Sequence, residues 1–381
     1  MASSKFKELT PAYGFDDVAL VPGDVTVNPE QTDISFFIAD HRFEIPILAA
    51  AMDGVVDPGF AVLFGKLGGL AVMNLEGVQT RYADADAVLE EIASAPALDV
   101  TALMQKVYSS PIKEELIGKR IKQIKEGGTV CAVSITPPNA KKLAPIAKEA
   151  GVDILVIQST VTTARHISKS YRGLIFSEFK QSIKLPVVVG NTVSFSAAME
   201  LMKEGIDGLL VGVGPGAACT TREVLGVGVP QITATIDSAA ARDAYFKESG
   251  RYVPIITDGG MKNGGDICKA IGAGADAIML GSIFAGAREA PGRGYHWGMA
   301  NPHASLPRGT RVKVASGAPL ERILFGPSSR TDGTENLVGA LRTSMGICSA
   351  RNIREMHKVR MVIAPSIKTE GKHFQMAQCA G

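Results

Sequence analysis

The sequence predicts a TIM barrel, the closed (β/α)8 fold in which eight parallel strands alternate with helices. Short apolar runs recur eight times along the 381 residues, and each is followed by a segment with helical periodicity. An open dinucleotide-binding sheet would carry a G-x-G-x-x-G signature. The nearest segment, 212–216, contains Pro215 and lacks the third glycine, so a closed barrel is the better interpretation.

The expected strands are short apolar runs, and each ends at a polar or small residue. In chain order they are residues 47–52, 70–73, 130–135, 154–158, 186–190, 208–212, 254–258 and 277–281.

Helices are expected between these strands. The clearest is 194–204, where Ser194 can cap the start, apolar positions recur along the segment and Gly205 ends it. The full set is residues 57–67, 82–93, 111–126, 138–150, 163–181, 194–204, 236–249 and 264–273.

We expect a single catalytic domain over residues 1–381. Its barrel core would occupy residues 47–290, and a flap with a closing segment would occupy 291–355. A polar C-terminal tail would follow at 356–381. No room is left for a separate regulatory module.

Composition narrows the classes of partner. Lysine plus arginine number 40 and aspartate plus glutamate 38, and the charges are interspersed, so nothing indicates nucleic acid or a membrane surface. No apolar run approaches the roughly 20 residues of a membrane helix. The five cysteines form no CxxC pair and the chain starts without an apolar signal segment, which predicts a reduced, cytoplasmic protein.

The loops after the last two expected strands are typical of a phosphate site. TIM barrels often bind phosphate there, and these loops read Asp258-Gly259-Gly260 and Gly281-Ser282. Glycines let backbone N–H groups approach a phosphate, and the serine adds a hydroxyl. Tight turns alone would also explain the glycines.

The loop after the sixth strand carries the candidate nucleophile. Cys219 follows the glycine-rich run 212–216, where backbone N–H groups can stabilise a thiolate. Composition alone would favour a small buried hydrophobic residue instead, and the other cysteines are assigned to that class.

Several motifs in one order resemble the IMP dehydrogenase and GMP reductase family. The sequence VGPGAACTTR at 213–222, followed by GVGVPQ at 226–231, is similar to its catalytic loop. Further matches are YGFDDVALVP at 13–22, AAAMD at 49–53, DGG at 258–260, MLGS at 279–282 and LRTSMG at 341–346. The resemblance covers roughly residues 10–355 and agrees with the predicted barrel.

The resemblance implies a purine nucleotide 5′-monophosphate bound over the barrel mouth. Cys219 would attack C2 of the purine to form a covalent intermediate, and Thr221 would pass a proton at the same carbon. Asp258 would bind the ribose hydroxyls, and Met52 would pack on the base. The remaining implied contacts are Gly260, Gly281 and Ser282 to the phosphate, His296 near the phosphate, and the backbone of Met299 to the base edge.

The resemblance also implies a nicotinamide cofactor, NADPH or NAD, stacked on the base. Its expected contacts are Gln158, Ser159, Thr160 and Asn191. The carbonyls of Gly214, Gly216 and Cys219 match the family's potassium loop. Family members assemble as tetramers, so a homotetramer or larger homo-oligomer is expected.

Three positions depart from the family pattern. Ala217 replaces a serine that would contact phosphate, and His296 replaces a tyrosine. At the end of the fourth strand, where the family has an aspartate near the nicotinamide ribose, this chain has Gln158-Ser159-Thr160. Glutamine can hydrogen-bond but carries no charge. The histidine could reach the phosphate or be a solvated bystander.

The expected reaction is that of a GMP reductase, with IMP dehydrogenase as the alternative. The segment 298–339 lacks the Arg-Tyr pair with which dehydrogenases activate water, and the regulatory CBS insert is absent. The general acid or base stays open among Arg308, Arg311 and Glu321. A catalytically silent nucleotide-binding relative is the third possibility.

Overall fold

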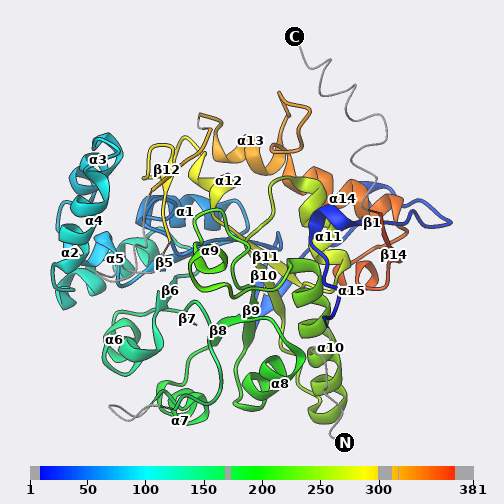
Figure 1. Ribbon diagram of the computed structural model, residues 1–381, viewed down its shortest axis with the longest axis horizontal. Coiled ribbons are helices and arrows are strands. Elements are labelled where there is room, and N and C mark those ends of the chain that lie inside the picture. Colours follow the sequence, from blue (N-terminus) through cyan, green and yellow to red (C-terminus); the bar gives the residue numbers. More distant parts are fainter. Residues whose placement is uncertain (1–8, 168–172, 299–310, 316, 365–381) are drawn as a thin grey trace, which may run out of the picture.

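The computed structural model describes residues 9–167, 173–298, 311–315 and 317–364, and its central strands close into a parallel barrel (Figure 1). The predicted TIM barrel is confirmed. Around the barrel the order is β10-β11-β4-β5-β6-β7-β8-β9, so the first barrel strand pairs with the last. Each strand overlaps the run predicted for it: β4 (Ile47–Ala49), β5 (Leu70–Asn74), β6 (Ala132–Ile135), β7 (Ile154–Gln158), β8 (Val187–Thr192), β9 (Gly208–Val211), β10 (Ile255–Asp258) and β11 (Ala277–Leu280).

Helices surround the barrel and pack on its outward-facing side chains (Figure 1). Their starts follow local chemistry: Asp57 Oδ1 accepts from Phe60 N–H at the start of α1, and Ser194 Oγ accepts from Ala197 N–H at the start of α8. The main helices are α1 (Pro58–Lys66), α2 (Val78–Arg81), α3 (Ala85–Ser94), α4 (Val100–Ser109), α5 (Glu114–Glu126), α6 (Pro137–Glu149), α7 (Phe176–Ile183), α8 (Phe195–Lys203), α10 (Gln231–Ser249) and α11 (Gly264–Gly272).

The remaining helices are short or lie in the closing part of the chain. They are α9 (Thr221–Leu225), α12 (Ser282–Ala285), α13 (Leu320–Phe325), α14 (Leu337–Ile347) and α15 (Ile353–Met356), with 3-10 turns at Phe15–Asp17 and Pro29–Gln31. Among the described residues, no helix combines the length and the apolar character needed to cross a membrane.

The helix predicted at 163–181 is wrong over its first part, because α7 begins only at Phe176. Ahead of it, Thr163 Oγ1 donates to the carbonyl of Arg165 at 2.7 Å. Such local bonds compete with a helical hydrogen-bond ladder. Residues 168–172 lie outside the described ranges.

The barrel interior is packed with side chains and is capped at its amino end. Inward-facing residues form one cluster, which includes Leu48, Leu70, Ala132, Ile154, Val188, Leu210, Ile256 and Ala277. The hairpin of β2 (Phe36–Ile38) and β3 (His41–Phe43) adds Phe36, Ile38 and Phe43 to this cluster. The rings of Phe36 and Phe43 stack with centroids 5.0 Å apart. The open face of the barrel is therefore at the carboxyl ends of the strands.

The chain between β5 and β6 builds a separate helical layer at one side of the barrel (Figure 1). Helices α2, α3 and α4 share an apolar cluster of Val78, Ala85, Leu89, Ile92, Val100, Met104 and Val107. Trp297, from the distant closing segment, belongs to the same cluster and is 1% exposed. The sequence predicted α3 but not α4.

Within the described ranges, three two-stranded sheets accompany the barrel. One is the β2–β3 hairpin; in another, β12 (Tyr295–His296) pairs with β13 (Val312–Lys313). In the third, β1 (Val18–Leu20) pairs antiparallel with β14 (Met361–Ile363). The last pairing joins the two ends of the described chain.

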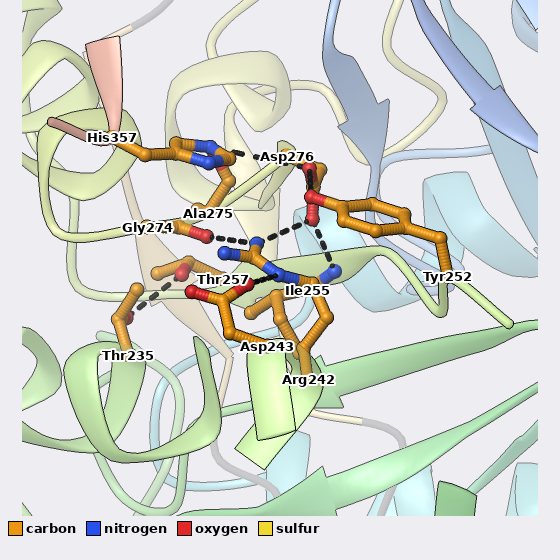
Figure 2. Close-up of polar contacts among 10 residues, drawn as sticks. All are labelled: Thr235, Arg242, Asp243, Tyr252, Ile255, Thr257, Gly274, Ala275, Asp276 and His357. Carbon is orange, nitrogen blue, oxygen red and sulfur yellow. Dashed lines mark hydrogen bonds and ion pairs between the residues drawn. The ribbon is translucent and has the colours of Figure 1, made fainter. Parts of the chain in front are cut away.

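A buried polar network lies at the amino ends of β10 and β11 (Figure 2). Arg242 of α10, with 2% of its side chain exposed, donates to Asp276 Oδ2 at 2.9 Å and to the carbonyl of Gly274 at 2.7 Å. The Asp276 carboxylate also accepts from the Tyr252 hydroxyl at 2.5 Å and from the Ile255 N–H at 2.8 Å. Every charge in this network therefore has a partner, which is what burial of a carboxylate requires.

Candidate active site

A cavity of about 660 Å³ lies over the carboxyl ends of the barrel strands. Loops from most of the strands and the closing segment line it. Nearly all the predicted site residues meet there, although they are spread over more than half of the sequence: Met52, Gln158, Ser159, Thr160, Asn191, Gly214, Gly216, Cys219, Thr221, Asp258, Gly260, Gly281, Ser282 and His296. Met299 lies outside the described residues.

Cys219 lies in this cavity on the loop between β9 and α9. Its backbone N–H donates to the Gly216 carbonyl at 2.9 Å, and its Sγ lies 3.2 Å from the Oγ1 of Thr221. Cys219 is half-buried, whereas burial raises the pKa of the Cys131 thiol to about 12 and that of Cys268 to about 11. Of the four cysteines that the structure describes, Cys219 is the one that is not fully buried, so its thiol is the one that a ligand in the cavity can reach.

Asp258, at the end of β10, is held by two amide side chains. Its Oδ2 accepts from Asn191 Nδ2 at 2.9 Å and from Gln158 Nε2 at 3.1 Å, and Gln158 Nε2 also lies 3.0 Å from Asn191 Oδ1. Burial raises the pKa of Asp258 to about 6, and the two amide hydrogen bonds oppose that shift. Because both bonds end on Oδ2, Oδ1 is left for the hydroxyl groups of a ligand.

The loop after β10 depends on glycine and contacts the cysteine loop. Gly259 and Gly260 both have φ of +84°, a conformation that other residues rarely adopt. A Cβ at Gly260 would lie 2.9 Å from the Cβ of Pro215. The candidate phosphate loop and the nucleophile loop therefore pack directly on each other.

The loop after β11 positions a methionine and a serine. A Cβ at Gly281 would lie 2.8 Å from the Sδ of Met52, so a larger residue at 281 would require the methionine side chain to shift. The hydroxyl of Ser282 lies 3.1 Å from Nε2 of His296. The structure thus brings these two predicted phosphate contacts together.

His296 is buried rather than solvated. It is 1% exposed, and burial lowers its pKa below the ordinary value for histidine. Its Nδ1 has no hydrogen-bond partner among the described residues. A neutral imidazole that donates from Nε2 would free the Ser282 hydroxyl proton for a ligand oxygen.

Two of the three candidates for the general acid or base occupy other positions. The Arg311 guanidinium donates to the carbonyls of Ile92, Ala93 and Ala95 at the end of α3, at 2.7 Å for Ala93, and it stacks on a tyrosine ring. It therefore caps a helix instead of serving the cavity, which corrects the sequence interpretation. Glu321 is exposed at the start of α13 and does not line the cavity.

The third candidate, Arg308, lies outside the described residues.

Sequence reasoning missed a polar wall supplied by the segment between α13 and α14. Arg330, Thr334 and Glu335 line the cavity there. The Glu335 carboxylate accepts from the backbone N–H of Ser329 at 2.6 Å and from its hydroxyl at 3.0 Å, and the first of these bonds is the main cause of the lowered pKa of Glu335. The only signal in the sequence was a polar run at 328–335, which is equally typical of a surface loop.

The cysteine loop offers oxygen donors for a cation. Gly214, Gly216 and Cys219 present backbone carbonyls, hard ligands of the kind that alkali and alkaline-earth cations prefer. The turn closed by Cys219 N–H to Gly216 O brings two of these residues together. In the described part of the chain, no group of three or more His, Cys, Asp or Glu side chains could hold a metal ion.

Residues 12–373 match the profile of the IMP dehydrogenase / GMP reductase domain. An uncharacterized oxidoreductase from Mycolicibacterium smegmatis is 38% identical, and the match covers 92% of this chain and 96% of that one. Inosine-5'-monophosphate dehydrogenase from Methanocaldococcus jannaschii is 30% identical over 97% of this chain and 96% of that one.

A solved structure agrees with the sequence matches. The crystal structure of an IMP dehydrogenase/GMP reductase-like protein from Corynebacterium glutamicum superposes with a TM-score of 0.89 and 34% sequence identity. The match covers 95% of this chain and 97% of the other, so the similarity extends over the barrel and the closing segment alike.

Proposed function

Because the chain belongs to the IMP dehydrogenase / GMP reductase family, we propose that it acts at C2 of a purine nucleotide through a covalent bond to Cys219. The observation that carries the proposal is the 3.2 Å contact between Cys219 Sγ and Thr221 Oγ1 inside the cavity. A thiol beside a hydroxyl can form the bond while the hydroxyl carries a proton.

The cavity supports binding of a nucleoside 5′-monophosphate. Asp258 Oδ1 would accept from the ribose hydroxyls, and Met52 would lie against the base. Backbone N–H groups of the glycine loops and the Ser282 hydroxyl would hold the phosphate, as the loops after the last two strands do in many TIM barrels. The backbone of Met299 would meet the base edge.

Reduction of GMP is the reaction that we favour. Cys219 Sγ would bond to C2, and the 2-amino group would leave as ammonia with a proton passed by Thr221. The C–S bond would break as C2 gains hydrogen, which gives IMP and restores the thiolate. Overall, GMP, NADPH and one proton would give IMP, NADP+ and ammonia, with NADPH supplying the hydride when bound.

The loops after β7 and β8 fit the nicotinamide cofactor of this chemistry. Gln158, Ser159, Thr160 and Asn191 line the cavity on that side. The buried Oε1 of Gln158 has no hydrogen-bond partner among the described residues, so it is ready to accept from a ligand amide or hydroxyl.

The opposite direction, oxidation of IMP with NAD and water, is the second candidate. The relative from Methanocaldococcus jannaschii carries that activity in its name. Against it stands the missing Arg-Tyr pair in 298–339. Potassium at Gly214, Gly216 and Cys219 would shape the cysteine loop in either direction, and a homotetramer is the proposed assembly.

The test is to mix purified protein with GMP and NADPH, and separately with IMP and NAD, with potassium present. Absorbance of the reduced cofactor should fall in the first mixture. A rise in the second mixture alone would replace the reductase with a dehydrogenase. No change in either mixture would leave the silent nucleotide-binding relative.

The Cys219→Ala variant tests the covalent step. We expect turnover to fall by at least about 10³-fold, because the nucleophile is removed. The unfolding midpoint should stay close to that of the wild type, since Cys219 is not part of the buried core. Turnover that survives this change would contradict the covalent mechanism.

A further inference from the structure

Three polar side chains form a hydrogen-bonded chain behind the cavity wall. The indole Nε1 of Trp297 donates to the Tyr108 hydroxyl at 2.5 Å, and that hydroxyl donates to Asp53 Oδ2 at 2.5 Å. Asp53 is 2% exposed and Trp297 is 1% exposed. The three residues come from the loop after β4, from α4 and from the loop after β12, and we call them the latch.

Both ends of the latch adjoin residues that line the cavity. Asp53 follows Met52 in the chain, and Trp297 lies between His296 and Gly298. Met52, His296 and Gly298 all line the cavity. A shift of either end of the latch would therefore move the wall against which the nucleotide base and phosphate are proposed to lie.

The loop after β4 packs tightly against residues 295–296. A Cβ at Gly54 would lie 2.5 Å from the carbonyl oxygen of Tyr295 and 3.0 Å from Cα of His296. A Cβ at Gly77 would lie 1.9 Å from Asp53 Oδ1. The loop after β4 thus packs directly on the backbone at 295–296, and the Asp53 carboxylate packs on Gly77, so a side chain at either glycine would displace its neighbour.

Tyr108 matches both of its partners. An indole N–H can only donate and a carboxylate can only accept, so the group between them must do both, as a hydroxyl does. Loss of that oxygen would leave a buried donor and a buried carboxylate unsatisfied. Burial already raises the pKa of Asp53 to about 6, while the bond from Tyr108 and the charge of Arg81 oppose that shift.

The latch also connects the apolar cluster of α2, α3 and α4 with the cavity wall. Trp297 packs inside the apolar cluster of α2, α3 and α4, and Tyr108 lies at its edge. We propose that Tyr108 is a positioning residue, through which the α2–α4 layer holds Met52 and the 296–298 loop in the geometry that binds the nucleotide. This inference rests on the proposed function for the identity of the ligand.

The test compares Tyr108→Phe with a matched control, Tyr82→Phe. The Tyr82 hydroxyl also makes two bonds, to the Val107 carbonyl at 3.1 Å and to Ser110 Oγ at 2.6 Å, but both stay within the α2–α4 segment. Calorimetric titration with GMP should show that Kd rises about ten-fold in Tyr108→Phe, and by less than about two-fold in the control.

A spectroscopic signature separates positioning from general loosening of the fold. Trp297 is the only tryptophan in the chain, so its emission reports on the latch alone. We expect Tyr108→Phe to change the emission maximum and to raise acrylamide quenching at temperatures far below unfolding. The control should do neither. In the wild type, GMP should reduce the quenching, because the residues on either side of the indole line the site.

A second variant, Trp297→Phe, keeps an aromatic ring and removes the donor, and should weaken GMP binding in the same direction. If Tyr108→Phe does not fold, the affinity of Trp297→Phe for GMP tests the proposal in its place. Folded variants that bind GMP as tightly as the wild type would overturn the latch. A wild-type protein that binds neither GMP nor IMP would instead overturn the proposed function, and the nucleotide role of the latch with it.

Discussion

Each end of the barrel holds an aspartate, and the two are partnered in opposite ways. At the amino end, Asp276 pairs with the Arg242 guanidinium and uses both of its oxygens (Figure 2). At the carboxyl end, Asp258 receives only the amides of Gln158 and Asn191, both on one oxygen. The amino end is complete in itself, whereas the carboxyl end lacks a partner that a ligand can supply.

Two buried polar atoms without a partner belong to residues of the cavity. Gln158 Oε1 and His296 Nδ1 are buried without partners among the described residues, and both residues line the cavity. No atom of the Arg242–Asp276 network is in this state within the described part of the chain. Since unsatisfied buried groups cost stability, these two atoms indicate positions in the cavity where a ligand can supply the missing hydrogen bonds.

The largest expected effect comes from removing the partner of Asp276 at the amino end of the barrel. Arg242→Met should lower the free energy of unfolding by about 3–5 kcal/mol, because it leaves the Asp276 carboxylate buried and unpaired. Arg165→Met is the matched control, since the Arg165–Glu200 pair is largely exposed and should cost less than about 0.5 kcal/mol. Chemical denaturation measures both. Equal losses in the two variants would mean that the network does not support the fold.

The next largest effect is expected at the carboxyl end of the barrel, where Asp258 has no charged partner. Asp258→Asn should lower turnover by about 10²-fold, because a ligand hydroxyl loses a charged acceptor. The free energy of unfolding, in contrast, should rise in this variant at neutral pH. The folded pKa of about 6 lies above the unfolded value, so the folded state binds more protons between about pH 4 and 6 and loses stability as pH rises through that window.

Asparagine at 258 should therefore remove this pH dependence and raise stability at neutral pH by on the order of 1 kcal/mol. Denaturation of both proteins at pH 4 and pH 7 checks the sign. A variant that is less stable than the wild type at pH 7 would show that Asp258 is satisfied by the protein alone.

The smallest expected effect is a difference in ligand response between two histidines, one at each end of the barrel. Burial lowers the pKa of His296 at the carboxyl end and of His357 at the amino end, where Nε2 donates to the Ala275 carbonyl at 2.9 Å. A bound phosphate should raise the pKa of His296 by favouring its charged form and leave His357 unchanged. Titration of the two imidazoles by NMR, with and without GMP, measures this. Equal responses would place the phosphate elsewhere.

The barrel and the site loops could be predicted because their signals are local. Each strand is an apolar run, and Cys219, Asp258 and Gly281 lie in short motifs at strand ends. The failures are non-local. The Arg242–Asp276 pair, the latch and the helix-capping role of Arg311 join residues far apart in the chain, and no periodicity reports on such contacts. The first part of the helix expected at 163–181 was wrong, because local hydroxyl bonds outweighed its apolar spacing, whereas its last part overlaps α7.

The antiparallel pairing of β1 with β14 has a consequence for biosynthesis. Residues 18–20 are translated before any barrel strand, and their partners at 361–363 are translated only after the last one. Strand β1 therefore stays without its partner strand while every barrel strand is translated, and the β1–β14 ladder can form only after the last barrel strand has been made. Pairing of β1 with β14 can therefore occur only in a chain whose barrel strands have all been synthesised.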